Sequence, residues 1–272
     1  MPRRRPGPDR SSPAHRRGRR VRLASILSAA VAAAALPRAV AAQYSVYPVI
    51  VQLAGADTAE SGVLVVRNEG DAALRIRLYA MDFEQAADGS HEYSELGTHP
   101  RSCRDRLGVF PDMLSVDPGM EGRVYLRMEP AISGDICWSV VFAETPAPTR
   151  SGLRITQRIG TKVYGLAPGT EPSGELASAA VQGGGSGRSV TFEFRNTGDR
   201  PLRPEGRVEI RSLEGAVAAS QEIESFSVLP GHSRRVEVEI PGGLAPGRYL
   251  AIPILDFGGD YLAGAQVAFR VR

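Results

Sequence analysis

Three histidines are the residues of this sequence that could most readily bind a metal. His91, His99 and His232 follow residue 42, and none of them lies at helical or zinc-type spacing to another ligand. The acidic residues around the Asp88–Gly89 dipeptide would suit a cation. However, this dipeptide stands between two alternating runs and is typical of a hairpin turn with solvated carboxylates. We therefore predict no metal site and no cofactor.

A glycine-rich segment is the feature that most resembles part of an enzyme. The segment GGGSG, Gly183 to Gly187, lacks the lysine of a phosphate-binding loop and the strand-to-helix setting of a nucleophile elbow. A flexible loop explains its composition. Because no Ser/His/Asp or Cys/His order stands out either, we predict that the chain is not an enzyme and has no catalytic residues.

Cys103 and Cys137 are the only cysteines of the chain. An oxidising compartment would favour a disulfide between them, and closing a loop of about 35 residues would stabilise the fold by roughly 3 to 4 kcal/mol. Two free thiols are the alternative. Cys137 stands beside Trp138, so a bridged Cys137 would belong to the core rather than act as a nucleophile.

The first forty-two residues have the three parts of an export signal. Nine arginines lie within Arg3–Arg22, a 14-residue apolar run follows at Leu23–Leu36, and small residues stand within Ala39–Ala42. The apolar run is too short to span a bilayer. We expect residues 1–42 to be a signal peptide and the product to be periplasmic, without stable membrane insertion. Export could use the general secretory or the twin-arginine route, and the polar Arg22 favours the first.

Removing this signal peptide reverses the charge of the chain. The peptide carries ten of the 33 basic residues and one of the 30 acidic ones, which leaves 23 basic and 29 acidic groups and a net charge of −6. Nucleic-acid binding draws on a positive protein surface. We therefore predict no nucleic-acid partner.

An internal repeat organises the remaining chain. RNEGDAALR at Arg67–Arg75 corresponds to RNTGDRPLR at Arg195–Arg203, and VDPGMEGRV at Val116–Val124 corresponds to VLPGHSRRV at Val228–Val236. Each Asn-x-Gly-Asp predicts a turn after a strand, and each Pro-Gly predicts a turn into a hairpin. Two related modules of short alternating strands predict an all-β chain with two immunoglobulin-like β-sandwiches.

The repeat also sets the expected domain boundaries. We expect an N-terminal immunoglobulin-like domain over residues 43–165, a linker rich in Pro and Gly over 166–173, and a C-terminal immunoglobulin-like domain over 174–272. The first module carries an insertion of about 16 residues around Cys103. A disulfide to Cys137 would attach this insertion to the sandwich.

Six strands are expected in the first module. They lie near Ser45–Leu53, Gly62–Arg67, Ala73–Glu84, Gly122–Met128, Ile136–Glu144 and Arg154–Tyr164. In the fifth, the central strand, alternation places four apolar side chains on one face, which we predict to be the core side. These four are Ile136, Trp138, Val140 and Phe142.

The export signal, the two sandwiches, the VDPG turn and the central strand CWSVVFAETP together resemble the periplasmic pilus-assembly chaperones of the chaperone-usher pathway, the PapD-like family. The resemblance covers most of residues 43–168, and the second module matches only in kind. It implies a chaperone whose partners are pilin-like subunits and an outer-membrane usher, working without a cofactor.

In that family, the last strand of the first domain is lent to a subunit whose own sandwich lacks a strand. The corresponding segment here is GLRITQRIGTKVYG, Gly152 to Gly165. A donated strand supplies main-chain hydrogen bonds for affinity and alternate side chains for specificity. The same alternation also suits an ordinary core strand. The resemblance implies four subunit-binding residues: Leu153, Ile155, Gln157 and Ile159.

The family also uses basic residues to hold the terminal carboxylate of the subunit. Arg158 and Lys162 are the local candidates for this anchor, and Lys162 is the only lysine of the chain. Ile50 stands where the family commonly has an arginine, so the clamp is half built. Gln157 interrupts the apolar row, so the donor strand also departs from the family pattern.

The leading hypothesis is a chaperone that covers apolar surface and strand edges of secreted, pilin-like subunits, which would otherwise aggregate. The alternative is a non-catalytic structural or adhesive surface protein whose two sandwiches present loops. The chaperone hypothesis requires a free edge on the last strand of the first module.

Overall fold

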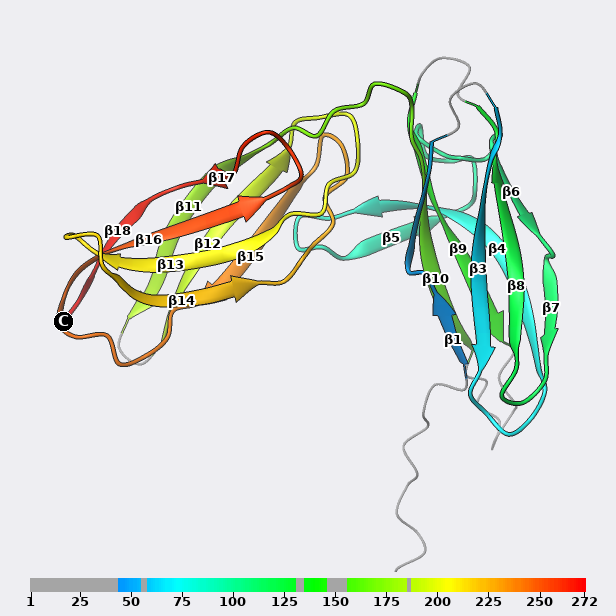
Figure 1. Cartoon of the computed structure of the whole chain (residues 1–272), viewed down its shortest axis with the longest axis horizontal. Coiled ribbons are helices and arrows are strands. Elements are labelled where there is room, and N and C mark those ends of the chain that lie inside the picture. Colours follow the sequence, from blue (N-terminus) through cyan, green and yellow to red (C-terminus); the bar gives the residue numbers. More distant parts are fainter. Residues whose placement is uncertain (1–43, 55–57, 131–134, 146–155, 185–186) are drawn as a thin grey trace, which may run out of the picture. The chain divides into compact units, whose positions relative to one another are not determined.

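Two β-sandwiches make up the described part of the chain. The computed structural model describes residues 44–54, 58–130, 135–145, 156–184 and 187–272, in which every helix or strand assigned is a strand. Strands β1 to β10 form the sheets of the first sandwich and β11 to β18 those of the second (Figure 1). The predicted all-β, two-sandwich fold is confirmed. The predicted signal peptide lies outside the described residues.

The first sandwich packs a four-stranded sheet against a six-stranded sheet. The four-stranded sheet has the order β1 (Tyr44–Tyr47), β3 (Glu60–Asn68), β8 (Glu121–Met128) and β6 (Leu107–Phe110). The six-stranded sheet has the order β2 (Ile50–Leu53), β10 (Gln157–Gly165), β9 (Cys137–Thr145), β4 (Leu74–Gln85) and β5 (His91–Ser94), and β7 (Met113–Val116) also pairs with β4.

The second sandwich has a three-stranded and a five-stranded sheet. The first of these has the order β11 (Gly174–Gly184), β12 (Gly187–Asn196) and β15 (Ser233–Glu239). The other has the order β14 (Val217–Ile223), β13 (Glu205–Ser212), β16 (Gly247–Asp256) and β17 (Ala263–Gly264), and β18 (Val267–Val271) also pairs with β16.

Asn68 and Asn196, the asparagines of the repeated motif, make the same three side-chain hydrogen bonds. Each side-chain amide donates to the carbonyl four residues later and to the carbonyl of Val116 or Val228, at 2.8 and 2.9 Å. Each side-chain oxygen accepts from the backbone N–H two residues later. Both residues are fully buried. Because buried polar groups need partners, the repeated asparagine ties the first turn of each module to its Pro-Gly segment.

The first predicted strand is wrong in its extent. The segment Ser45–Leu53 was expected to be continuous, but it divides into β1 and β2, which belong to different sheets. Pro48 lies at the division. Proline has no N–H and cannot continue a hydrogen-bonded ladder, so the chain passes from one sheet to the other there.

The predicted core face of the central strand is also wrong. In β9, the core between the two sheets takes Cys137, Val141 and Ala143. Trp138 and Phe142 instead join a second apolar cluster on the opposite face, as do Ile136 and Val140. The strand is buried almost throughout. Alternation identifies two faces but cannot tell which is the interior when both are apolar.

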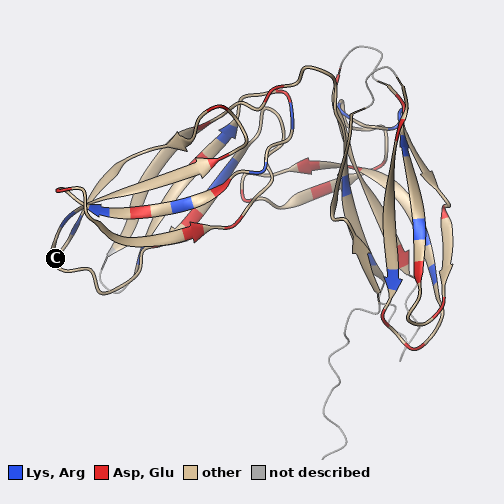
Figure 2. Ribbon diagram, viewed as in Figure 1, with Lys and Arg blue, Asp and Glu red and all other residues tan. Residues whose placement is uncertain are grey.

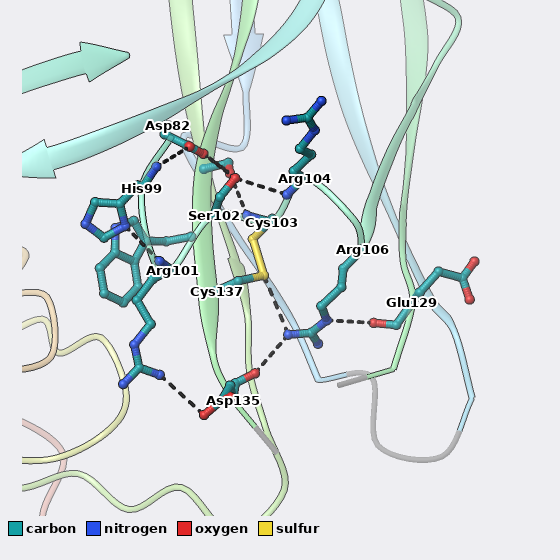
Figure 3. Close-up of a disulfide and its surroundings, with 12 residues drawn as sticks. Asp82, His99, Arg101, Ser102, Cys103, Arg104, Arg106, Glu129, Asp135 and Cys137 are labelled. Carbon is teal, nitrogen blue, oxygen red and sulfur yellow. Dashed lines mark hydrogen bonds and ion pairs between the residues drawn. A yellow bond between two sulfur atoms is a disulfide. The ribbon is translucent and has the colours of Figure 1, made fainter. Parts of the chain in front are cut away.

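The insertion of the first module is attached to the sandwich at two points (Figure 3). The expected disulfide joins Cys103 to Cys137 of β9, with 5.1 Å between the Cα atoms. Near it, the buried carboxylate of Asp82 accepts five hydrogen bonds, and their number explains how this charge is held in the interior. The donors are the backbone N–H groups of Gly97, Thr98 and His99 and the hydroxyls of Ser102 and Ser139.

The charged residues of the described chain are distributed over both sandwiches. Strands of both sandwiches carry Lys or Arg and Asp or Glu, and the two signs alternate along β13 (Figure 2). Over the same residues, no helix has the length and apolar character needed to cross a membrane.

Candidate functional site

The edge of β10 is the candidate functional site. This strand pairs antiparallel with β9 along its whole length, from Gln157 to Gly165. On its other side it pairs in parallel with β2, but only from Lys162 to Gly165. Within the described residues, no strand therefore pairs with this side of β10 between Gln157 and Thr161.

The backbone N–H and C=O groups of two residues of β10, Arg158 and Gly160, point toward this open edge. The N–H groups of Lys162 and Leu166 donate to the β2 side, to the carbonyls of Val49 and Leu53, at 3.0 and 2.8 Å. In an extended strand, the N–H and C=O groups of alternate residues point to the same side. Those of Arg158 and Gly160 consequently point to the open edge and can bind another strand.

The beginning of the described part of β10 is held from the core side. The hydroxyl of Tyr44 lies 2.7 Å from the carbonyl oxygen of Ala143 and 3.2 Å from that of Gln157. Burial raises the pKa of Tyr44 to about 12, so the hydroxyl keeps its proton at neutral pH. Its position fixes the beginning of β10 against β9.

The side chains of β10 divide between two faces. Thr161 and Val163 are buried, and the half-buried Ile159 packs against the core of the first sandwich. Gln157, also half-buried, shares this face by alternation. The remaining predicted donor residues, Leu153 and Ile155, lie outside the described residues.

Arg158 lies on the other face, over aromatic rings. Its guanidinium carbon is 4.6 Å from the ring centre of Phe142 and 5.5 Å from that of Tyr93. Such stacking stabilises a cation without a carboxylate partner. Arg158 is exposed, so its charge remains accessible to solvent.

Lys162 differs from Arg158 because it is half-buried and its neighbouring charges are positive. Burial, and after it the charges of Arg203 and Arg234, lower the pKa of Lys162 to about 8. Its ammonium nitrogen lies 5.7 Å from the ring centre of Phe83. Among the described residues, Lys162 forms no ion pair with an acidic side chain. The position therefore offers positive charge that an anionic ligand would stabilise.

His91 and Ile50 complete the surroundings of Lys162. Burial lowers the pKa of His91, followed by the charges of Lys162 and Arg234, and its Nε2 atom is buried without a hydrogen-bond partner. Ile50, the departure from the family pattern, is the register partner of Lys162 on β2. Sequence analysis considered His91 only as a metal ligand and did not select Arg203 or Arg234, because the three residues come from separate segments of the chain.

The acidic residues around Asp88–Gly89 have separate roles in the structure. Asp88 accepts hydrogen bonds from the backbone and side chain of Ser90 in the predicted turn. The carboxylate of Glu84 instead contacts two histidine rings, those of His99 and His232. Over the described residues, no group of three or more metal-ligating side chains is arranged to hold a metal ion.

No protein-family model matches this sequence, and no curated protein matches it. One solved structure of similar shape is a chaperone-tip adhesin complex of CFA/I fimbriae biogenesis. It has 12% identity and a TM-score of 0.49, over 84% of this chain and 98% of that chain. The class 5 fimbriae chaperone CfaA has 10% identity and a TM-score of 0.47, over 84% of this chain and 99% of that chain.

A third similar structure is the CsuC-CsuE chaperone-tip adhesion subunit complex of Acinetobacter baumannii. It has 12% identity and a TM-score of 0.43, over 72% of this chain and 91% of that chain. Likeness at this level does not assign a function. A functional hypothesis for this chain is therefore based on the β10 edge and on the surroundings of Lys162.

Proposed function

We propose that this protein is a periplasmic chaperone that binds pilin-like secreted subunits by β-strand addition at the edge of β10 and assists their folding and assembly. The observation that carries the proposal is the unpaired side of β10 between Gln157 and Thr161. A subunit that lacks one strand would gain main-chain hydrogen bonds there, from Arg158 and Gly160. An outer-membrane usher would then receive the subunit.

Lys162 is the residue we assign to the terminal carboxylate of the subunit. It is half-buried, its positive neighbours raise the local potential, and a carboxylate would form a charge-assisted hydrogen bond with it. Arg158 is the weaker candidate because it is exposed and stacked on aromatic rings. Arg203 and Arg234 supply positive charge near a site where Ile50 supplies none.

The test is co-expression with exported candidate subunits, followed by pull-down from the periplasm. Ile159→Asp and Ile155→Asp place a charge in the proposed subunit-binding row, and each should reduce capture by about tenfold or more. Val63→Asp is the matched control, because Val63 is 40% exposed on β3 of the other sheet. Near-ultraviolet circular dichroism identifies the folded variants.

Capture by folded Ile159→Asp and Ile155→Asp at the wild-type level would contradict strand addition at β10. Loss of capture in Val63→Asp would also contradict it, since binding would then involve the other sheet. A structural or adhesive surface protein predicts that none of these substitutions changes capture.

The anchor is tested with a synthetic peptide that corresponds to the last strand of a captured subunit. Lys162→Gln should weaken binding of the free-acid peptide by about tenfold or more, and wild type should bind the C-terminally amidated peptide as weakly. Arg158→Gln is the control and should retain most of the affinity. If Arg158→Gln loses the affinity and Lys162→Gln keeps it, the assignment to Lys162 is wrong.

A further inference from the structure

The end of β4 and the turn after it are bound to the segment that contains the second Pro-Gly turn. Gln85 donates from Nε2 to the carbonyl of Ser227 at 2.8 Å and accepts the N–H of Leu229 at 3.1 Å. The N–H of Arg235 donates to the carbonyl of Ala87 at 2.8 Å. These contacts define a junction between residues 84–87 and residues 227–235.

The carboxylate of Glu84 lies at this junction, between two imidazole rings. Its Oε2 atom is 2.7 Å from Nε2 of His99, and its Oε1 atom contacts Nε2 of His232. The N–H of Arg101 donates to Nδ1 of His99, at 3.0 Å. Since Nδ1 of His99 accepts, its proton is on Nε2, and His99 binds Glu84 as a neutral ring.

His232 has the opposite requirement. Its Nδ1 atom is 2.9 Å from the carbonyl oxygen of Pro230, which can only accept, so Nδ1 carries a proton. Its Nε2 atom faces the carboxylate of Glu84, which also accepts when ionised. Both contacts are satisfied together only when both ring nitrogens are protonated, and His232 is then an imidazolium.

We propose that the Glu84–His232 contact makes this junction sensitive to pH, so that it is closed while His232 is an imidazolium and loosens when His232 loses a proton. A neutral His232 has one proton for two acceptors. Either the bond to Pro230 or the bond to Glu84 must then be lost, and the remaining polar pair is less strongly bound. The proposal does not depend on subunit binding.

Other charged groups surround the contact without replacing it. Asp82 of β4 is occupied by the insertion, and Arg101 reaches His99 through its backbone. Arg234 lies two residues from His232 and interacts electrostatically with His91 of β5 and Lys162 of β10. Among these neighbours, the described residues place only Glu84 as an anionic partner of His232.

The ionisation of Glu84 determines the low pH at which the Glu84–His232 contact is lost. Burial raises the pKa of Glu84, but the hydrogen bonds of His232 and His99 and the charge of His232 outweigh it, so the pKa lies below its ordinary value of 4.5. The ionised Glu84 carboxylate stabilises the folded protein above its ordinary pKa, and this contribution is lost as the pH falls through its lowered folded-state pKa. Loosening on the alkaline side therefore arises from His232.

The test measures amide hydrogen exchange of Arg235, whose N–H closes the junction, from about pH 5.5 to about pH 8.5, with protection factors corrected for the intrinsic pH dependence. In the wild type, protection should fall by about tenfold as the pH rises. Glu84→Gln should remove this response, because a neutral amide can donate to or accept from His232 in either state. His232→Asn should remove it too, because asparagine does not titrate.

His91→Gln is the matched control, since His91 is a half-buried histidine outside the Glu84 contact, and it should respond as the wild type does. Amide protection within β9 and β16 shows whether each variant is folded. Unchanged protection of Arg235 in the wild type would overturn the proposal. So would a response that persists in both Glu84→Gln and His232→Asn, or one that disappears in His91→Gln.

Discussion

Lys162 combines partial burial with two nearby arginines and no acidic partner among the described residues. A cation in this setting destabilises the free protein, because burial and like charges both disfavour the protonated form. The same properties favour binding of an anion. These properties support the assignment of Lys162, proposed above, to an anionic group of a ligand.

Replacing Lys162 by methionine should stabilise the free protein at pH 7 by about 1 kcal/mol or more. Methionine keeps the apolar stem and removes the charge. Because the folded-state pKa of about 8 lies below the ordinary value of 10.5, the cost of the charge is complete below pH 8 and disappears as the pH rises toward 10.5. Urea denaturation at several pH values measures the gain, which should shrink at alkaline pH.

Arg158→Met is the control for this measurement, since Arg158 is exposed and on the same face of β10. It should leave the stability of the free protein nearly unchanged or lower it slightly, through loss of its stacking on Phe142. Equal stabilisation by both substitutions would show that the charge of Lys162 costs the folded protein no more than that of the exposed Arg158.

At the scale of the element, β10 is divided into two halves by β2. From Lys162 onward it is an interior strand of the six-stranded sheet, and over Gln157–Thr161 no second strand among the described residues pairs with it. An unprotected edge is a hazard for a soluble protein, because it can pair with other chains. Alternation in the sequence predicted the strand, but the same alternation occurs in an edge and in an interior strand.

Arg158→Pro should abolish subunit capture and leave the first sandwich folded. Its N–H points to the open edge, so proline removes a donor that β9 does not use. Thr161→Pro is the matched variant on the same strand, and its N–H points to β9, so it should lower the melting temperature markedly. Thermal unfolding and pull-down of each variant distinguish these effects. Full capture by a folded Arg158→Pro variant would show that the edge donor is not needed.

At the scale of the whole molecule, the second apolar cluster joins elements far apart in sequence. Phe83, Trp138 and Tyr164 pack in it with Leu229, which is almost fully buried. This cluster lies beside the Glu84–His232 contact, because the Trp138 ring is 5.2 Å from that of His99 and 6.4 Å from that of His232. Trp138, the single tryptophan, therefore reports on the junction.

Leu229→Ala should shift the emission of Trp138 to longer wavelength and destabilise the protein by about 2 to 4 kcal/mol. Leu255→Ala is the matched control, since Leu255 is equally buried but belongs to the core of the second sandwich. It should cost similar stability without changing the emission of the folded protein. An unchanged emission in Leu229→Ala would mean that Leu229 does not cover the indole in solution.

The sequence by itself determined the local features of this protein. The repeated asparagines predicted two related turns, and Asn68 and Asn196 make matching hydrogen bonds because a turn is closed by neighbours in the chain. Alternation predicted the strands, and the two cysteines predicted the disulfide.

Apart from the disulfide, the features that depend on partners distant in sequence follow only from the packing of the sheets. This packing determined which face of β9 is the core, where β2 stops covering β10, and which charges surround Lys162. It also brought Glu84 to His232, which are 148 residues apart. Periodicity specifies the direction of a side chain, but only the packing of sheets specifies what the side chain meets.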